Sequence, residues 1–178
     1  ITLNTKTKKK ENAIGYLPQK LEINRSLSIT VRDFLKLNIN TKNREEKNKI
    51  IKEMLEFLHS EDLIDKQFIH LSRGQIQRIL FIASLLNNPE ILLLDEPTTG
   101  ADPTAEETIY QHIIELKETK NMGIIFVSHD LSIVHKLADK VLCLNKQMIC
   151  FGEPSKTLSE SVIKKIYGEN IKIYEHHH

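Results

Sequence analysis

The chain has 178 residues, with 25 lysines and arginines against 24 aspartates and glutamates, giving a formal net charge of +1. This length predicts one domain with a sizeable core and room for a smaller subdomain. The near-neutral charge argues against bulk attraction to nucleic acid or anionic lipid. The longest nearly apolar run, Ile79 to Leu86, is far shorter than the ~20 residues that cross a bilayer. Nothing resembles a signal peptide, so we expect a cytosolic chain.

The N-terminal part of the sequence indicates two strands, Ile1 to Asn4 and Ala13 to Leu17, joined by a lysine-rich turn. Pro18 and Gln19 follow the second strand. From residue 21 to about 70 the pattern is helical. Thr30 is a candidate N-cap for a first helix, and a polar loop over 38–48 precedes a second. The second helix has apolar residues at helical spacing, namely Ile50, Ile51, Met54, Leu55 and Leu58. This region is therefore expected to form a small all-helical subdomain.

Ser72 stands at the predicted start of a long helix that ends near Pro89. Four aliphatic residues, Ile91 to Leu94, then predict a strand buried on both faces. Asp95 and Glu96 follow this strand directly. Because ligands of open α/β sheets bind at the carboxyl ends of the strands, two acids there suggest a metal ligand and a base. By themselves these residues fit a buried strand with a polar end equally well.

The remaining elements follow in the same alternating order. Asp102 and Pro103 suit the N-cap and first position of a helix. A second aliphatic strand, Ile124 to Val127, is followed by His129 and by a further helix. Val141 to Leu144 and Met148 to Phe151 predict a hairpin, and a last helix is expected from Leu158 to about Gly168.

The predicted hairpin places Cys143 opposite Cys150. This arrangement would suit a disulfide or part of a metal site. Two ligands do not make a zinc site, and cytosolic redox conditions favour reduced thiols. We therefore expect two buried thiols.

Five short motifs, YLPQ, LSRGQ, LLLDEP, TTGAD and SHD, occur in this order along the chain. In order and spacing they resemble the Q-loop, signature, Walker B, D-loop and H-loop of the ATP-binding subunits of ABC transporters. No GxxxxGK[ST] sequence is present, so the resemblance implies an N-terminally truncated chain that is inactive alone.

The resemblance implies an α/β, P-loop NTPase-like ATP-binding core, incomplete at the N-terminus, with an inserted all-helical subdomain. The expected organisation is core strands over 1–19, the helical subdomain and signature helix over 20–88, the rest of the core over 89–175, and a histidine tail or tag remnant over 176–178.

The family's functional residues carry over by motif. The resemblance implies that Asp95 and Gln19 bind Mg²⁺ and that Gln19 also reaches the attacking water. It implies that Glu96 acts as the base and that His129 stabilises the transition state. It further implies contacts in trans to the ATP of a facing copy, made by Ser72, Gly74, Gln75 and Asp102. Each residue also has a structural alternative, since serine and aspartate cap helices and histidine often satisfies backbone groups at strand ends.

Arg73 departs from the glycine that is commoner at its position in the signature. A cation at a helix N-terminus opposes the helix dipole by up to ~1 kcal/mol. We therefore expect the side chain to point to solvent or to lie near phosphate, and we leave Arg73 out of the site.

The segments GYLPQKLEIN and VLCLN and the ending IYEHHH resemble the ATP-binding subunits of bacterial zinc importers, although the histidines equally suit a tag remnant. This resemblance implies ATP hydrolysis between two head-to-tail copies at the cytoplasmic face of the inner membrane. The implied partners are an integral-membrane permease for zinc or manganese and, indirectly, a periplasmic metal-binding protein, with no nucleic acid. The alternatives are a soluble ABC ATPase of DNA repair or translation, and a non-hydrolysing fragment.

Overall fold

The computed structural model describes residues 13–19, 28–100, 103–120 and 122–168, and only the backbone of 103–105. The chain divides into two compact units at the bond between Val127 and Ser128. The predicted strand Ile1 to Asn4, the predicted cap Asp102 and the terminal histidines lie outside the described residues.

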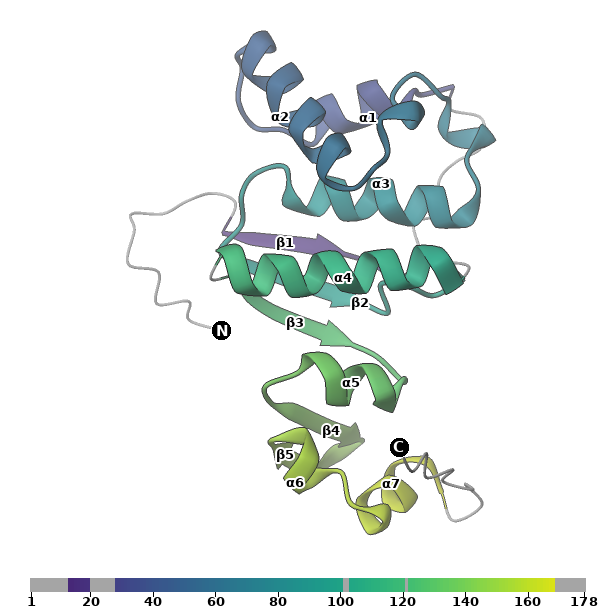
Figure 1. Cartoon of the computed structure of the whole chain (residues 1–178), viewed down its shortest axis with the longest axis vertical. Helices are drawn as coiled ribbons and strands as arrows, with labels where there is room; N and C mark the ends of the chain where they lie inside the picture. Colours follow the sequence, from purple (N-terminus) through teal and green to yellow (C-terminus); the bar gives the residue numbers. More distant parts are fainter. Residues whose placement is uncertain (1–12, 20–27, 101–102, 121, 169–178) are drawn as a thin grey trace. The chain divides into compact units, whose positions relative to one another are not determined.

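The first unit contains a parallel sheet with the strand order β1-β2-β3 (Figure 1). Its strands are β1 (Ile14–Leu17), β2 (Ile91–Asp95) and β3 (Gly123–Val127). In the register, Leu17 lies beside Leu94 and Asp95 beside Val127. Since all three strands run in the same direction, the residues that follow them meet at one edge of the sheet.

One face of the sheet is buried beneath the helix α3 (Arg73–Leu85). Leu17, Leu92 and Leu94 lie on this face and are almost fully buried. A Cβ at Gly15 would collide with the backbone oxygen of Ser84, so only glycine lets α3 pack this close to β1.

The other face of the sheet is partly exposed to solvent. Tyr16, Ile125 and Val127 expose 56, 62 and 56% of their surfaces, and Ile91 and Leu93 are only half-buried. The prediction that the strand from Ile91 to Leu94, which is β2, is buried on both faces is therefore wrong for Ile91 and Leu93. An aliphatic run shows that a strand is suited to burial, but the elements packed around it decide how much of it is buried.

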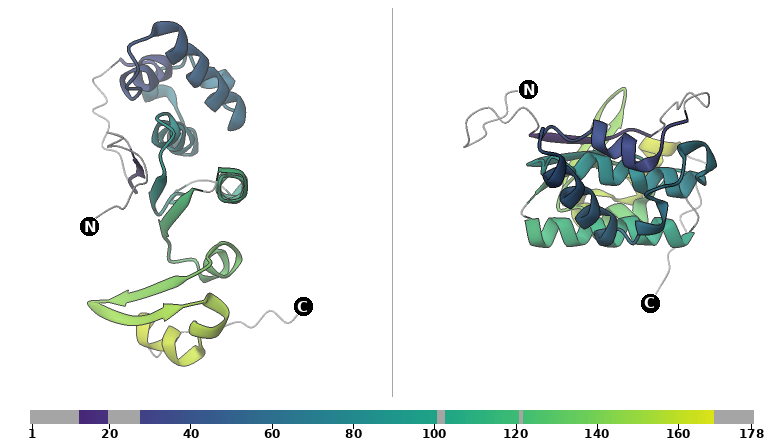
Figure 2. Two further views of the ribbon diagram at one scale, coloured as in Figure 1. Left: turned by 90° about the vertical axis from the view of Figure 1, so that its left-hand side faces the viewer. Right: turned by 90° about the horizontal axis from the view of Figure 1, so that it is seen from above.

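The helix α4 (Pro103–Lys120) connects β2 to β3 and lies on one side of the sheet (Figure 2). Ile109, Ile113 and Leu116 are buried, as their spacing predicts.

The helical subdomain contains α1 (Val31–Leu37), α2 (Arg44–Phe57) and two short 3-10 turns, Glu61–Leu63 and Phe68–His70. The predicted cap of α1 is confirmed, because the Thr30 hydroxyl accepts a hydrogen bond from the amide of Asp33 at 3.1 Å. The predicted polar loop over 38–48 is too long. Asn43 caps α2 by accepting bonds from the amides of Glu45 and Glu46, so this polar stretch is already helical from Arg44.

The second unit contains α5 (Leu131–Leu137), the antiparallel hairpin of β4 (Val141–Asn145) and β5 (Gln147–Gly152), α6 (Pro154–Thr157) and α7 (Glu160–Tyr167). The hairpin is as predicted. The predicted last helix corresponds to α7, which begins two residues later than predicted and ends before Gly168, and the short helix α6 that precedes it was not predicted.

Cys143 and Cys150 form a disulfide across the hairpin, so the expectation of two thiols is wrong. The register sets the two residues directly opposite each other, with 4.9 Å between their Cα atoms. This separation lies within the range that a disulfide spans.

None of the helices in the described ranges combines the length and apolarity required to cross a membrane.

Candidate functional site

The C-terminal edge of the sheet brings Gln19 and Glu96 together. Gln19 lies two residues beyond β1, and Glu96 follows β2 directly. The side-chain amide of Gln19 donates a hydrogen bond from Nε2 to Oε2 of Glu96 at 2.7 Å, although the residues are 77 positions apart. Asp95, the last residue of β2, lies at the same edge. The structure therefore brings two of the predicted site residues, Gln19 and Glu96, into contact and places Asp95 at the same edge.

Glu96 has an unusual backbone conformation for a residue with a side chain. Its φ angle is +44°, in the left-handed region. Its amide donates to the carbonyl of Val127 at 3.0 Å, and its carbonyl accepts from the amide of Thr99 at 3.1 Å. A left-handed conformation costs roughly 1–2 kcal/mol for an L-residue, and such strain is concentrated at functional sites.

The turn after Glu96 supplies a second donor to the same carboxylate. The Thr99 hydroxyl donates to Oε2 of Glu96 at 2.7 Å, so this oxygen accepts from both Thr99 and Gln19. Sequence reasoning missed Thr99. The available signal was a hydroxyl three residues after an acid in a predicted turn, because such a turn returns the hydroxyl to the acid.

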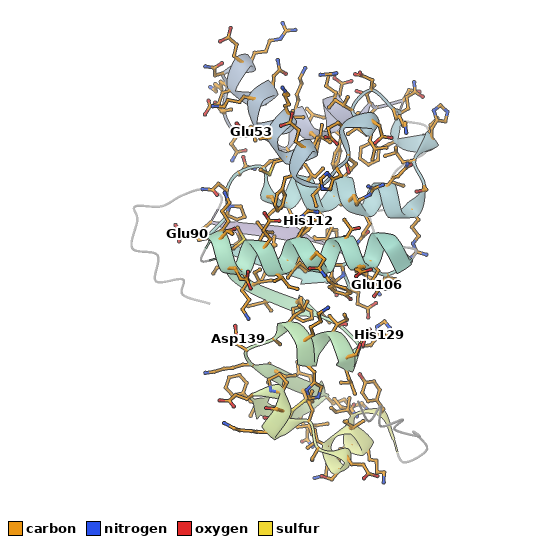
Figure 3. All side chains as sticks on the ribbon, viewed as in Figure 1. Glu53, Glu90, Glu106, His112, His129 and Asp139 are labelled. Atoms are coloured by element: carbon orange, nitrogen blue, oxygen red, sulfur yellow. A yellow bond between two sulfur atoms is a disulfide. The ribbon has the colours of Figure 1, made fainter. Side chains whose placement is uncertain are left out.

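Thr98 anchors the turn to α4. Its hydroxyl donates to Glu106 at 3.2 Å and lies 3.0 Å from the hydroxyl of Tyr110. Figure 3 labels Glu106 on α4. Hydrogen bonds of Thr98 and Thr99 thus connect this turn both to α4 and to the carboxylate of Glu96.

The signature residues form the N-terminus of α3. The Ser72 hydroxyl accepts from the Gln75 amide at 3.2 Å, and the Gln75 side chain accepts from the Ser72 amide at 2.9 Å. This reciprocal capping box is worth about 1 kcal/mol. Gly74 is buried, whereas Ser72 is exposed. The capping role of Ser72 is confirmed, and the contact of these residues with ATP in trans stays a prediction.

Arg73 contacts a residue that the sequence analysis did not anticipate. Its guanidinium lies against Gly100 in the turn after Glu96, although the side chain is also exposed as expected. The sequence offered no signal for this contact, because the two residues belong to different motifs.

His129 belongs to the second unit, where it precedes α5 (Figure 3). Its carbonyl accepts a hydrogen bond from the Tyr167 hydroxyl at 3.1 Å. Burial raises the pKa of Tyr167, and the charge of Asp130 raises it further. Partial burial acts to raise the pKa of Asp130, but hydrogen bonds from Ser132 and Ile133 together with the nearby His129 lower it overall. The approach of His129 to Glu96 stays a prediction.

The chain matches the family model described as ABC transporter over residues 2–99. It is 35% identical over 181 aligned residues to the "Zinc import ATP-binding protein ZnuC" of Hydrogenovibrio crunogenus, covering 97% of this chain and 70% of the relative. It is 40% identical to the protein of the same name from Buchnera aphidicola subsp. Acyrthosiphon pisum, covering 93% of this chain and 69% of that one.

Among solved structures, the ATP-binding cassette MJ0796, a dimer in a post-hydrolysis state bound to ADP and Pi, matches with a TM-score of 0.65 and 26% identity. The match covers 74% of this chain and 58% of that one. The architecture is therefore that of an ABC ATP-binding core. The chain spans about 70% of the length of the two relatives. Sequence and structure agree, and this chain belongs to the ABC transporter family.

Proposed function

We propose that this chain is the ATP-hydrolysing subunit of a zinc or manganese ABC importer, bound peripherally to the cytoplasmic face of a bacterial inner membrane. The relatives named as zinc import ATP-binding proteins support the zinc assignment. The observation that carries the catalytic part is the 2.7 Å hydrogen bond between Gln19 and Glu96.

Glu96 is suited to act as the base. Two donors fix its Oε2 atom, and the backbone bonds to Val127 and Thr99 fix its Cα position. A carboxylate held in one orientation can accept a proton from an attacking water without first reorganising. In the proposed reaction Gln19 positions that water, and His129 stabilises the charge that develops on the γ-phosphate.

The oxygen atoms at this edge fit Mg²⁺. Asp95 offers a carboxylate, and Gln19 offers its amide oxygen because its nitrogen is used toward Glu96. Mg²⁺ in proteins takes few protein oxygens and completes its shell with water and substrate phosphates. When bound with ATP, the ion would neutralise phosphate charge.

The second half of the proposed site comes from a facing copy. Ser72, Gly74 and Gln75 at the N-terminus of α3, together with Asp102, would contact the ATP held by the other copy. A helix N-terminus offers amide donors and a positive dipole end, which suit a phosphate. A dimeric solved cassette supports this arrangement. Closure of the two copies would move the helical subdomain, and this subdomain would transmit the motion to the permease. A periplasmic metal-binding protein would deliver the ion to the permease.

The test uses the full-length protein with its permease. Glu96→Gln preserves the shape of the side chain and removes its basicity, so ATP binding should persist while turnover falls by about 10²- to 10⁴-fold. Glu107→Gln, at an exposed position in α4, is the matched control and should leave turnover unchanged. Turnover by the Glu96→Gln protein at the wild-type rate would refute the assignment of the base.

The transported ion needs a separate experiment. An importer-deficient strain that expresses this subunit with its permease should take up labelled zinc, and Glu96→Gln should abolish the uptake. Uptake of manganese but not zinc would assign manganese, and uptake of neither ion would refute the importer assignment.

A further inference from the structure

The stability of α3 does not explain why an arginine stands at position 73. It is the first residue of α3, and Ser72 and Gln75 already cap that end. A cation there opposes the helix dipole. The role of this side chain must therefore be sought in what it contacts.

The contact is with the backbone of Gly100. A Cβ added to Gly100 would lie almost equally close to Cζ, Nε and Nη1 of Arg73. The three distances are 2.3, 2.3 and 2.5 Å. Because the guanidinium is planar, a point so nearly equidistant from three of its bonded atoms lies above the plane and not beside its edge. Gly100 has a φ angle of +77°. The position therefore requires glycine for its conformation and also lacks the side chain that would keep Arg73 away.

Gly100 is covalently joined to the residue that holds the carboxylate of Glu96. Thr99 donates its hydroxyl to Oε2 of Glu96 at 2.7 Å and its amide to the Glu96 carbonyl at 3.1 Å. Arg73 thus contacts the residue that directly follows the four-residue turn from Glu96 to Thr99. All of these residues lie in the first unit.

We propose that Arg73 is a positioning residue that holds the Thr99–Gly100 segment in place and thereby orients the carboxylate of Glu96. This inference rests on the proposed function, in which Glu96 is the base. Arg73 is next to Ser72, so the helix end that would contact the ATP of a facing copy also supports the base of its own copy. A planar cation performs this task by covering the glycine backbone, which a lysine ammonium on a flexible stem does not do.

The primary test compares Arg73→Gly and Arg73→Lys in the full-length protein. Both should lower kcat for ATP roughly three- to tenfold, with KM for ATP changed by less than about twofold, because the oriented base is needed in the transition state and not for binding. Full activity of Arg73→Lys would show that the charge suffices and would overturn the proposal, as would a change in KM alone.

The matched control is Arg44→Gly. Arg44 is also an exposed arginine at the first position of a helix, after the capping residue Asn43. The substitution removes the same charge and introduces the same backbone freedom, so kcat should not change. An equal loss in Arg44→Gly would attribute the effect to charge or helix stability and overturn the proposal.

Two further measurements test the path from Arg73 to Glu96. Thr99→Val removes the hydroxyl, and combining it with Arg73→Gly should lower kcat no further than the more damaging single change does. Hydrogen exchange of the segment 96–100 should be faster in Arg73→Gly and unchanged in Arg44→Gly. Additive losses of kcat or unchanged exchange would overturn the proposal. Absence of ATP turnover in the wild-type protein, with the exchange effect intact, would overturn only the proposed function.

Discussion

At the residue scale, Glu96 is held in a conformation that side chains disfavour. Its φ angle of +44° is fixed by the Val127 carbonyl and by the turn to Thr99. A glycine would adopt this conformation without strain. The strain is thus a cost in stability that is retained because only a side chain at this point can supply the carboxylate.

This strain predicts that glycine is more favourable than alanine at position 96, the reverse of their order within a helix. Glu96→Gly should be more stable than Glu96→Ala by about 1 kcal/mol, because glycine accommodates the positive φ angle. Urea denaturation of both variants measures the difference. At Glu107 in α4 the order should reverse, with glycine less stable than alanine by about 1 kcal/mol, because that backbone is helical. A glycine penalty of the same sign at both positions would contradict the account.

At the element scale, α4 carries a buried histidine on the side that meets the end of α2. His112, labelled in Figure 3, exposes only 8% of its surface. Its ring centroid lies 4.6 Å from that of Phe57 and 6.2 Å from that of His59. Its Nδ1 atom lies 3.5 Å from a carboxylate oxygen of Glu115 but makes no hydrogen bond among the described residues. The packing of α4 therefore depends on an imidazole that is favoured in its neutral form.

Burial lowers the pKa of His112 below its ordinary value of 6.5, Glu115 opposes this shift, and His59 adds to it. Below pH 6.5 the unfolded chain binds a proton that the folded chain resists, so the unfolded state binds more protons and stability decreases as the pH is lowered. The contribution of His112 should be fully present above pH 6.5 and decrease below it. The measurement is the free energy of unfolding as a function of pH over about pH 5–8, the range in which histidines usually titrate.

His112→Phe should flatten this dependence on pH, since phenylalanine keeps a ring beside Phe57 and binds no proton. His135→Phe, at an exposed position on α5, serves as the control and should leave the dependence unchanged. A wild-type stability that is constant from pH 8 to 5, or an unchanged slope in His112→Phe, would refute the role of His112.

At the scale of the whole molecule, the chain has two compact units, and the described disulfide lies entirely in the second. Cys143 and Cys150 are seven residues apart, so the bridge closes a short loop within one hairpin. Cross-linking a loop of this size removes about 2–3 kcal/mol of unfolded-chain entropy.

Reduction should therefore loosen the second unit and leave the first unchanged. Hydrogen exchange over 141–152 should accelerate on addition of a reductant, while exchange in α3 should not. The double variant Cys143→Ser with Cys150→Ser should exchange rapidly with or without reductant. Protection of the hairpin that survives reduction would contradict the stabilising role of the bridge.

The amino-acid sequence by itself determined the order of the elements, the caps at Thr30 and Ser72, the hairpin, and the placement of Gln19, Asp95 and Glu96 at strand ends. These features depend on periodicity and on hydrogen bonds within one or two turns of the chain, so neighbouring residues suffice to predict them. Only the tertiary structure decided the bond from Gln19 to Glu96, the packing of Arg73 on Gly100, the disulfide, and the partial exposure of the outer face of β2. Each of these depends on how separate segments pack together, and no local pattern encodes the register or the distance of closest approach between them.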